Sequence, residues 1–261
     1  MSPIKNLLNT MARLRDKDTG CPWDIEQTYA SLAPFTLEEA YEVVDAISRG
    51  NIDDLKEELG DLLLQVVFHA QMADEAGDFT FDDVANTLNQ KLISRHPHVF
   101  GDESAKSAED VLGIWQTAKD KERANKPQNS LLDDVPVNFP ALLRAQKISK
   151  KAAKAWFEWQ QTEDVIDKII EELNEFRAEL VSGNKELQEE ELGDVFFTLV
   201  NLGRRLDIDC ETAMRKCNDK FYRRFSGMES DIKAELKSMK TLTATEWEDY
   251  WQAQKKKEQK I

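Results

Sequence analysis

The residues best suited to chemistry are two pairs of acidic side chains in the second half of the chain. Glu172 and Glu175 form one pair, and Glu191 and Asp194 form the other. On a helix, a spacing of three residues places both members of a pair on one face. Four carboxylates that converge raise one another's pKa values, and divalent cations offset this repulsion. Oxygen-only ligands suit Mg²⁺, or Mn²⁺ as a substitute, which predicts a metal site for nucleotide or polyphosphate chemistry.

The segment between the pairs indicates how they meet. Ser182, Gly183 and Asn184 are typical of the end of one helix and the start of the next. A short turn makes two helices antiparallel neighbours, so the carboxylates would face each other across a helix hairpin. Apolar residues recur at helical spacing over residues 187–206 and again over 55–72. No convincing strand pattern accompanies them, and we expect an all-α fold.

The same acidic pattern occurs 133 residues earlier, as Glu39, Glu42, Glu58 and Asp61. Over residues 38–67, 11 of 30 positions are identical without a gap, where composition alone predicts roughly two. This indicates a tandem duplication of one helical domain. Three prolines between 127 and 140 predict a linker at 124–140, with an N-terminal domain at 1–123 and a C-terminal domain at 141–261.

Cations for phosphate binding are also present. Lys220 and Arg224 are spaced to share one helical face, Arg223 is adjacent, and Lys168 precedes Glu172 by one turn. Trp251 offers a surface on which a base can stack. The spacing alone does not decide the role of these residues. Lys220, Arg223 and Arg224 also fit an ordinary charged helix face, a single lysine such as Lys168 is more often a surface residue, and a tryptophan on a terminal helix is more often part of core or interface packing.

Composition excludes several classes of function. The chain has 35 Lys+Arg and 50 Asp+Glu, a net charge of −15, which disfavours binding to nucleic acid or to an anionic membrane. Three cysteines without a C-x-x-C pair predict neither a disulfide framework nor a zinc site. No histidine follows a glutamate by three residues, which excludes a Glu-x-x-His di-iron site. With no signal-peptide pattern, we expect a cytoplasmic location.

The motifs resemble those of the MazG nucleoside triphosphate pyrophosphohydrolases over nearly the whole chain. The motifs that carry the resemblance lie at residues 20–24, 27–28, 37–42, 57–61, 95–100 and 140–147, together with E-x-x-E…E-x-x-D in both halves. The resemblance implies two tandem helical-bundle domains of the all-α pyrophosphatase type, usually assembled as a homodimer. It implies Mg²⁺-dependent hydrolysis of (d)NTP to (d)NMP and pyrophosphate, for house-cleaning or stress-related control of nucleotide pools. A protein partner is suggested by family association only.

The resemblance also implies roles for individual residues. It assigns the metals to Glu172, Glu175, Glu191 and Asp194, which would form the catalytic set. It assigns the nucleotide to Lys168, Glu171, Glu172, Lys220, Arg223, Arg224 and Trp251. Glu171 and Glu190 are candidates for orienting the attacking water.

In two-domain relatives, catalysis is attributed mainly to the C-terminal domain. The sequence offers a reason, because Phe35 and Ser94 stand where the C-terminal half has Lys168 and Arg223, although Lys91 and Arg95 remain. We therefore expect the N-terminal site to be weak, regulatory or structural. Two alternatives stay open: a nucleotide sensor without turnover, and a phosphatase that releases orthophosphate.

Overall fold

The computed structural model describes residues 2–124 and 129–258, and all regular elements in these ranges are helices. The prediction of an all-α fold is confirmed for this part of the chain. The protein divides into two compact units, residues 1–126 and residues 127–261, called here the N-terminal unit and the C-terminal unit. None of the described helices is long and apolar enough to cross a membrane.

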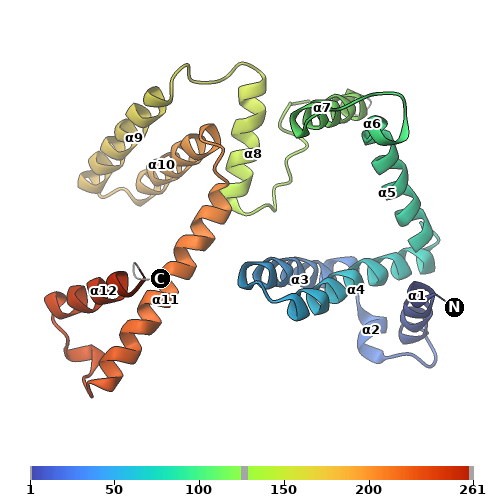
Figure 1. Cartoon of the computed structure of the whole chain (residues 1–261), viewed down its shortest axis with the longest axis horizontal. Coiled ribbons are helices and arrows are strands. Elements are labelled where there is room, and N and C mark those ends of the chain that lie inside the picture. Colours follow the sequence, from blue (N-terminus) through green and yellow to red (C-terminus); the bar gives the residue numbers. More distant parts are fainter. Residues whose placement is uncertain (1, 125–128, 259–261) are drawn as a thin grey trace. The chain divides into compact units, whose positions relative to one another are not determined.

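The N-terminal unit is built on two long helices, α3 and α4, which lie side by side (Figure 1). α1 packs on α4, and α5 and α7 follow as an extension of the unit. Met11, Leu32, Val67, Phe68 and Met72 form the core where α1, α3 and α4 meet. The helices are α1 (Pro3–Leu14), α2 (Pro22–Glu26), α3 (Tyr29–Arg49), α4 (Ile52–Ala76), α5 (Phe81–Arg95), α6 (Pro97–Phe100) and α7 (Ala108–Ala124).

The C-terminal unit repeats the long hairpin as α9 and α10, with α8 packed on α10. α11 begins beside α8 and α10 and then packs along α12, where Met228, Ile232 and Tyr250 are buried. The helices are α8 (Ala141–Lys154), α9 (Thr162–Ser182), α10 (Lys185–Arg205), α11 (Cys210–Ala234) and α12 (Ala244–Glu258), with a short 3₁₀-helix, η1 (Met239–Thr241), before α12.

The two hairpin turns have the same chemistry. Gly50 and Gly183 adopt left-handed conformations, with φ of 68° and 74°, directly after α3 and α9. Asn51 and Asn184 then cap the following helices, each accepting backbone N–H groups of the first turn through its side-chain oxygen. The predicted helix–turn–helix at residues 182–184 is confirmed, and its counterpart in the N-terminal half has the same form.

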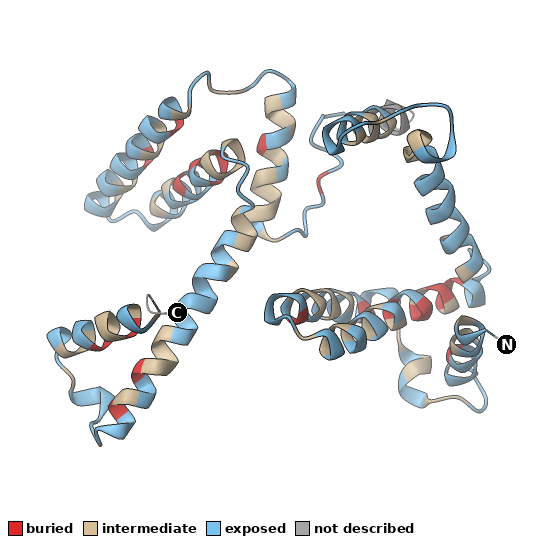
Figure 2. Ribbon diagram, in the orientation of Figure 1, coloured by how far each residue is buried: buried red, intermediate tan, exposed pale blue. Residues whose placement is uncertain are grey.

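Burial is uneven along the second helix of each hairpin. The buried residues of α4 begin at Gln65, and those of α10 begin at Val195, so both sets lie away from the turn (Figure 2). The first halves of α4 and α10, which carry the acidic residues, keep large apolar side chains exposed. The carboxylates of α4 and α10 therefore lie in the more exposed half of each helix.

The predicted linker at 124–140 lies partly outside the described residues. In its described part, Val135 is buried, and Lys151 of α8 forms an ion pair with Asp134. The Lys151 ammonium also donates to the Leu131 carbonyl oxygen at 3.0 Å. Residues 131–135 thus pack against α8. The domain boundaries proposed from the sequence remain predictions.

Three helices of the C-terminal unit end on a left-handed residue other than glycine. Trp156, Asp207 and Leu236, with φ of 66°, 54° and 56°, follow α8, α10 and α11. After α8, the Phe157 N–H donates to the Ala152 carbonyl at 3.1 Å, which closes the helix end. Glycine is usual at such a position, because a Cβ there crowds the neighbouring carbonyl.

Replacing Trp156 by Gly is expected to stabilise the protein by about 0.5–1 kcal/mol. Left-handed strain costs about 1–2 kcal/mol for a residue with a Cβ, and the added freedom of the unfolded chain offsets part of this gain. The Trp156 side chain is 94% exposed, so little packing is lost. Urea unfolding measures the change, with Phe157→Gly as the control at an exposed neighbour whose φ is not positive. A lower stability for Trp156→Gly would contradict the prediction.

Candidate metal centre

Three of the four acidic residues predicted in the C-terminal unit meet between α9 and α10. Carboxylate oxygens of Glu172, Glu175 and Glu191 all lie within 4.8 Å of one another. Glu172 and Glu175 extend from α9, one turn apart, and Glu191 reaches them from α10. Glu172 is buried, with 6% of its surface exposed. Asp194 lies on α10 outside this group of three and is exposed.

The carboxylates perturb one another. Loss of solvent raises the pKa of Glu191 most, and the charges of Glu175, Asp194 and Glu172 raise it further. Loss of solvent also raises the pKa of Glu175, followed by the hydrogen bond and the charge of Glu172. These shifts mean that the negative charge of the cluster is under-compensated, which is the condition that a divalent cation relieves.

Lys168 provides one positive charge at the cluster. Its ammonium group lies 2.6 Å from Glu171 and 3.0 Å from Glu172. The two hydrogen bonds, to Glu171 first and then to Glu172, raise the pKa of Lys168 further above its already high usual value. Lys168 is therefore fully charged at neutral pH, and its charge is placed beside the buried carboxylate.

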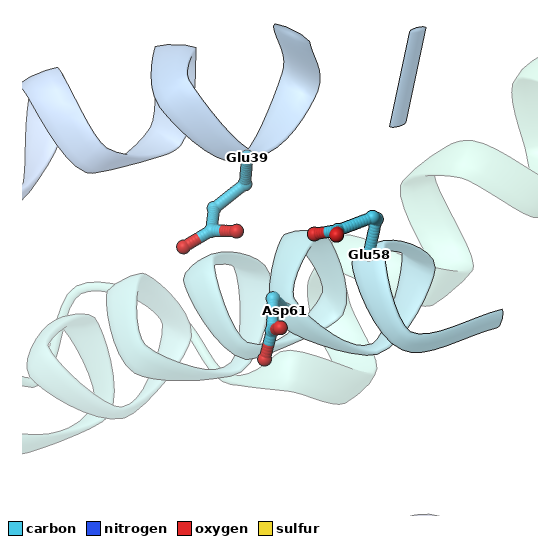
Figure 3. Close-up of side chains that lie close together, drawn as sticks. All are labelled: Glu39, Glu58 and Asp61. Carbon is cyan, nitrogen blue, oxygen red and sulfur yellow. The ribbon is translucent and has the colours of Figure 1, made fainter. Parts of the chain in front are cut away.

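The N-terminal unit carries a second cluster of three. Glu39 extends from α3 toward Glu58 and Asp61 of α4 (Figure 3), and their carboxylate oxygens lie within 4.8 Å of one another. Loss of solvent raises the pKa of Glu39, followed by the charges of Asp61 and Glu42. The pKa of Glu58 is raised by loss of solvent and then by Glu42. Glu42 is therefore close to Glu58, although it lies outside the group of three.

The two clusters differ at the position one turn before the first glutamate. The C-terminal unit has Lys168 there, bonded to Glu172. The N-terminal unit has Phe35, whose ring contacts that of Trp23 from α2, with the centroids 6.3 Å apart and the planes at 72°. An aromatic pair thus replaces an ion pair at the same place in the hairpin.

The remaining predicted nucleotide residues form a separate group on α11 and α12. Arg224 forms an ion pair with Glu258 at 2.7 Å, and its guanidinium lies over the Trp251 ring, 5.3 Å from the centroid. Arg223 lies 3.5 Å from the other oxygen of Glu258. The bond to Arg224 is the main reason that the pKa of Glu258 is lowered. Trp251 also packs against the buried core of α11 and α12.

The structure therefore assembles the predicted residues in two groups. One group, on α9 and α10, contains Lys168, Glu171, Glu172, Glu175 and Glu191, and the other, on α11 and α12, contains Arg223, Arg224 and Trp251. Lys220 and Glu190 are exposed on α11 and α10. Sequence reasoning missed Glu258 as the partner of both arginines. The internal repeat could have drawn attention to Glu258, because Glu122 and Glu258 match at the same offset as Trp115 and Trp251.

The fold and the site together define an all-α protein with a duplicated, carboxylate-bearing helix hairpin. The family model described as the MazG nucleotide pyrophosphohydrolase domain matches residues 27–100 and 160–227. These two segments contain both acidic clusters. The chain belongs to the MazG nucleotide pyrophosphohydrolase family, and the resemblance inferred from its motifs is confirmed.

Two similar proteins cover nearly the full length of the chain, and a third covers part of it. It is 48% identical over 260 residues, 99% of each chain, to the nucleoside triphosphate pyrophosphohydrolase of Escherichia coli (strain K12). It is 43% identical over 97% of its length, and 95% of the relative's, to the nucleoside triphosphate pyrophosphohydrolase/pyrophosphatase MazG of Thermotoga maritima. A nucleoside triphosphate pyrophosphohydrolase of Mycobacterium tuberculosis is 48% identical over 58% of the chain and 46% of its own length.

Proposed function

We propose that this protein hydrolyses nucleoside and deoxynucleoside triphosphates to the monophosphate and pyrophosphate, with Mg²⁺ or Mn²⁺ and mainly in the C-terminal unit. The observation that carries this proposal is the cluster of Glu172, Glu175 and Glu191 with Lys168 bonded to its buried member. Family membership supports the choice of reaction. The reaction adds one water across the bond between the α- and β-phosphates.

The residues fit a magnesium ion. The donor set consists of carboxylate oxygens, which Mg²⁺ prefers, and two ligands on one octahedral Mg²⁺ lie up to about 4.2 Å apart. The separations within the cluster, at most 4.8 Å, require only small side-chain rotations to reach that value. Glu172, Glu175 and Glu191 would hold the metal, and Asp194 is one turn away on α10 to complete the set. When bound, Mg²⁺ would neutralise the negative charge of the carboxylates and of the substrate phosphates.

Two groups of cations would then bind the triphosphate. Lys168 already stands at the cluster, where it can exchange its bond to Glu171 for one to a phosphate oxygen. Arg224 lies over the Trp251 ring, and Arg223 shares the carboxylate of Glu258 with Arg224, so a nucleotide bound at the indole would have its phosphates near both guanidinium groups. Lys220 on the same helix would add a further charge. It remains a prediction that Lys220 binds phosphate and that Asp194 binds the metal. It also remains a prediction that Glu171 or Glu190 orients the attacking water.

The N-terminal cluster of Glu39, Glu58 and Asp61 would bind a metal with fewer phosphate contacts. Phe35 cannot replace the charge of Lys168, and Ser94 stands in place of Arg223. A site with this composition holds a triphosphate weakly. We therefore expect little or no turnover there.

Product analysis with purified protein tests the proposed reaction. A panel of NTPs and dNTPs is incubated with Mg²⁺, with Mn²⁺, and with EDTA. We expect monophosphate and pyrophosphate in equal amounts, with activity lost in EDTA. Release of orthophosphate would instead identify a phosphatase. Binding of nucleotides without turnover would identify a sensor.

We also propose that the protein is a homodimer in which the exposed apolar faces of the hairpins are covered. Leu59, Leu63 and Val66 on α4 are exposed, as are their counterparts Leu192, Phe196 and Leu199 on α10. A two-helix layer needs a further layer to bury its apolar face. The exposed apolar residues of α4 and α10 occupy equivalent positions in the internal repeat, which supports one such apolar face in each unit. A cytoplasmic location and a role in nucleotide-pool control remain predictions, as does a protein partner.

Replacing Phe196 by Glu is expected to shift the protein from dimer to monomer at micromolar concentration. A charge placed on an apolar interface is left unpaired and desolvated, which costs several kcal/mol. Analytical ultracentrifugation measures the mass, with Val181→Glu as a control at an exposed apolar residue beside the hairpin turn. A monomeric wild-type protein, or an unchanged mass in Phe196→Glu, would contradict the proposed face.

A further inference from the structure

Glu258, the last residue of α12, contacts two arginines of α11 through one carboxylate. Its Oε2 atom accepts hydrogen bonds from Nε and Nη2 of Arg224, at 2.8 and 2.7 Å. Its Oε1 atom lies 3.5 Å from Nη2 of Arg223. Adjacent residues of a helix do not share a face, so the two arginine side chains leave α11 in different directions. The shared carboxylate draws their guanidinium groups to one place.

The two arginines differ in how firmly they are held. The side chain of Arg224 is 15% exposed, and its guanidinium group lies over the Trp251 ring, 5.3 Å from the centroid. The side chain of Arg223 is 62% exposed. A long side chain with this exposure samples many rotamers unless a partner restrains it. Glu258 is such a partner for Arg223, and it also fixes the orientation of Arg224.

The bonds to Glu258 use only one edge of the Arg224 guanidinium group. Nε and Nη2 form that edge. The other edge, formed by Nη1 and the second N–H of Nη2, has the geometry that binds a phosphate group through two parallel hydrogen bonds. Glu258 can therefore orient Arg224 without occupying the edge that a phosphate needs.

The packing of α12 on α11 does not rest on Glu258 alone. Tyr250 is buried between the two helices, and its hydroxyl donates to Glu235 at 2.7 Å. The side-chain amide of Gln254 donates to Asp231 at 2.6 Å. These contacts join α12 to α11 without the carboxylate of Glu258. The contacts of Glu258 with the arginines thus serve a purpose other than helix docking.

We propose that Glu258 is a positioning residue for the nucleotide and that it pre-forms the pair of Arg223 and Arg224 for the phosphate chain. This inference rests on the proposed function, which assigns both arginines to the substrate phosphates. Ordering a flexible side chain at the moment of binding lowers affinity, and Glu258 orders both arginines beforehand. Its charge also offsets the repulsion between the two guanidinium groups.

The test compares full-length wild type with Glu258→Gln in Mg²⁺. Isothermal titration calorimetry measures binding of the α,β-methylene analogues of ATP, GTP, CTP and UTP, in which the bond to be hydrolysed is replaced. Steady-state kinetics use the corresponding triphosphates. We expect Kd and KM to rise by about tenfold, the effect of leaving two long side chains unordered. We expect kcat to stay within about twofold, because this contact is made equally before and in the transition state.

The matched control is Glu248→Gln on the same helix. Glu248 is exposed and accepts a hydrogen bond from Gln252, one turn away on α12. The variant makes the same chemical change and should alter neither Kd nor KM. Glu258→Asp keeps the charge on a shorter side chain and should retain part of the affinity. Thermal unfolding checks every variant, and Glu258→Asp is compared with Glu248→Asp if Glu258→Gln unfolds early.

A double-mutant cycle separates positioning from a general effect on the fold. In the variant Arg223→Gln/Arg224→Gln, adding Glu258→Gln should cause no further loss of affinity, because no guanidinium group remains for the carboxylate to hold. A purely structural role of Glu258 would lower the affinity equally in both backgrounds.

Three results would overturn the inference. The first is an unchanged Kd and KM in Glu258→Gln, and the second is an equal loss with and without the two arginines. The third is tighter binding in Glu258→Gln, which would make Glu258 a competitor of phosphate. Pyrophosphate release is measured on the same preparations. Turnover that Glu258→Gln leaves unchanged refutes this inference alone, whereas absence of turnover in the wild type refutes the proposed function.

Discussion

Replacing Glu172 by Gln is expected to lower the rate of pyrophosphate release by at least about a thousandfold. Glu172 is the buried member of the C-terminal cluster, within 4.8 Å of both Glu175 and Glu191. The amide keeps the shape of the side chain but loses its negative charge. Loss of a metal ligand removes several kcal/mol of transition-state stabilisation, and each 1.4 kcal/mol is a factor of ten.

The matched control is Glu39→Gln, which makes the same change in the N-terminal cluster. We expect it to retain turnover within about twofold, an effect well below 1 kcal/mol. Steady-state kinetics with Mg²⁺ and a continuous assay for pyrophosphate measure both variants. A large loss in Glu39→Gln with activity retained in Glu172→Gln would place catalysis in the N-terminal unit and contradict the argument from the missing cations.

Replacing Lys168 by Met is expected to lower kcat/KM for triphosphates by about 10- to 100-fold. A hydrogen bond between a charged group and a phosphate contributes about 1.5–3 kcal/mol. Methionine keeps most of the length of the side chain and removes the ammonium group. Lys168 is also bonded to the buried Glu172, so its removal leaves that carboxylate without its cation and is expected to lower the folding stability as well. Thermal unfolding of Lys168→Met therefore accompanies the kinetics, which are measured where the variant is folded.

Two further variants separate charge from shape in this experiment. Lys168→Arg retains a positive charge and should recover part of the lost activity. Phe35→Met changes the equivalent position of the N-terminal unit and should leave kcat/KM for triphosphates unchanged. Equal losses in Lys168→Met and Phe35→Met, measured under the same conditions, would show that both units act on the triphosphate.

Local structure could be predicted from the sequence with good accuracy. The turn at 182–184 lies where glycine and asparagine indicated it, because Gly183 tolerates the left-handed conformation and Asn184 caps the next helix. The acidic pairs share faces of their helices for the same kind of reason, since a spacing of three residues sets their angle around the axis. These are properties of short segments, and they do not depend on the rest of the chain.

The composition of each cluster could not be predicted in the same way. Four carboxylates were expected in each half, yet Asp194 and Glu42 lie outside the groups of three. Which members approach depends on how two helices are rotated against each other, and that rotation is set by side-chain packing along their whole contact. The helical spacing within each pair contains no information on it.

The sequence by itself determined the all-α fold, the duplication, the family and the identity of the acidic residues, because these follow from local periodicity and from repeated motifs. Only the tertiary structure decided which side chains from separate helices contact each other. Arg224 is bound to Glu258 because α12 packs back along α11, and Phe35 of α3 contacts the ring of Trp23 from α2. Such contacts join separate helices, and they form only when burial of apolar surface brings those helices together.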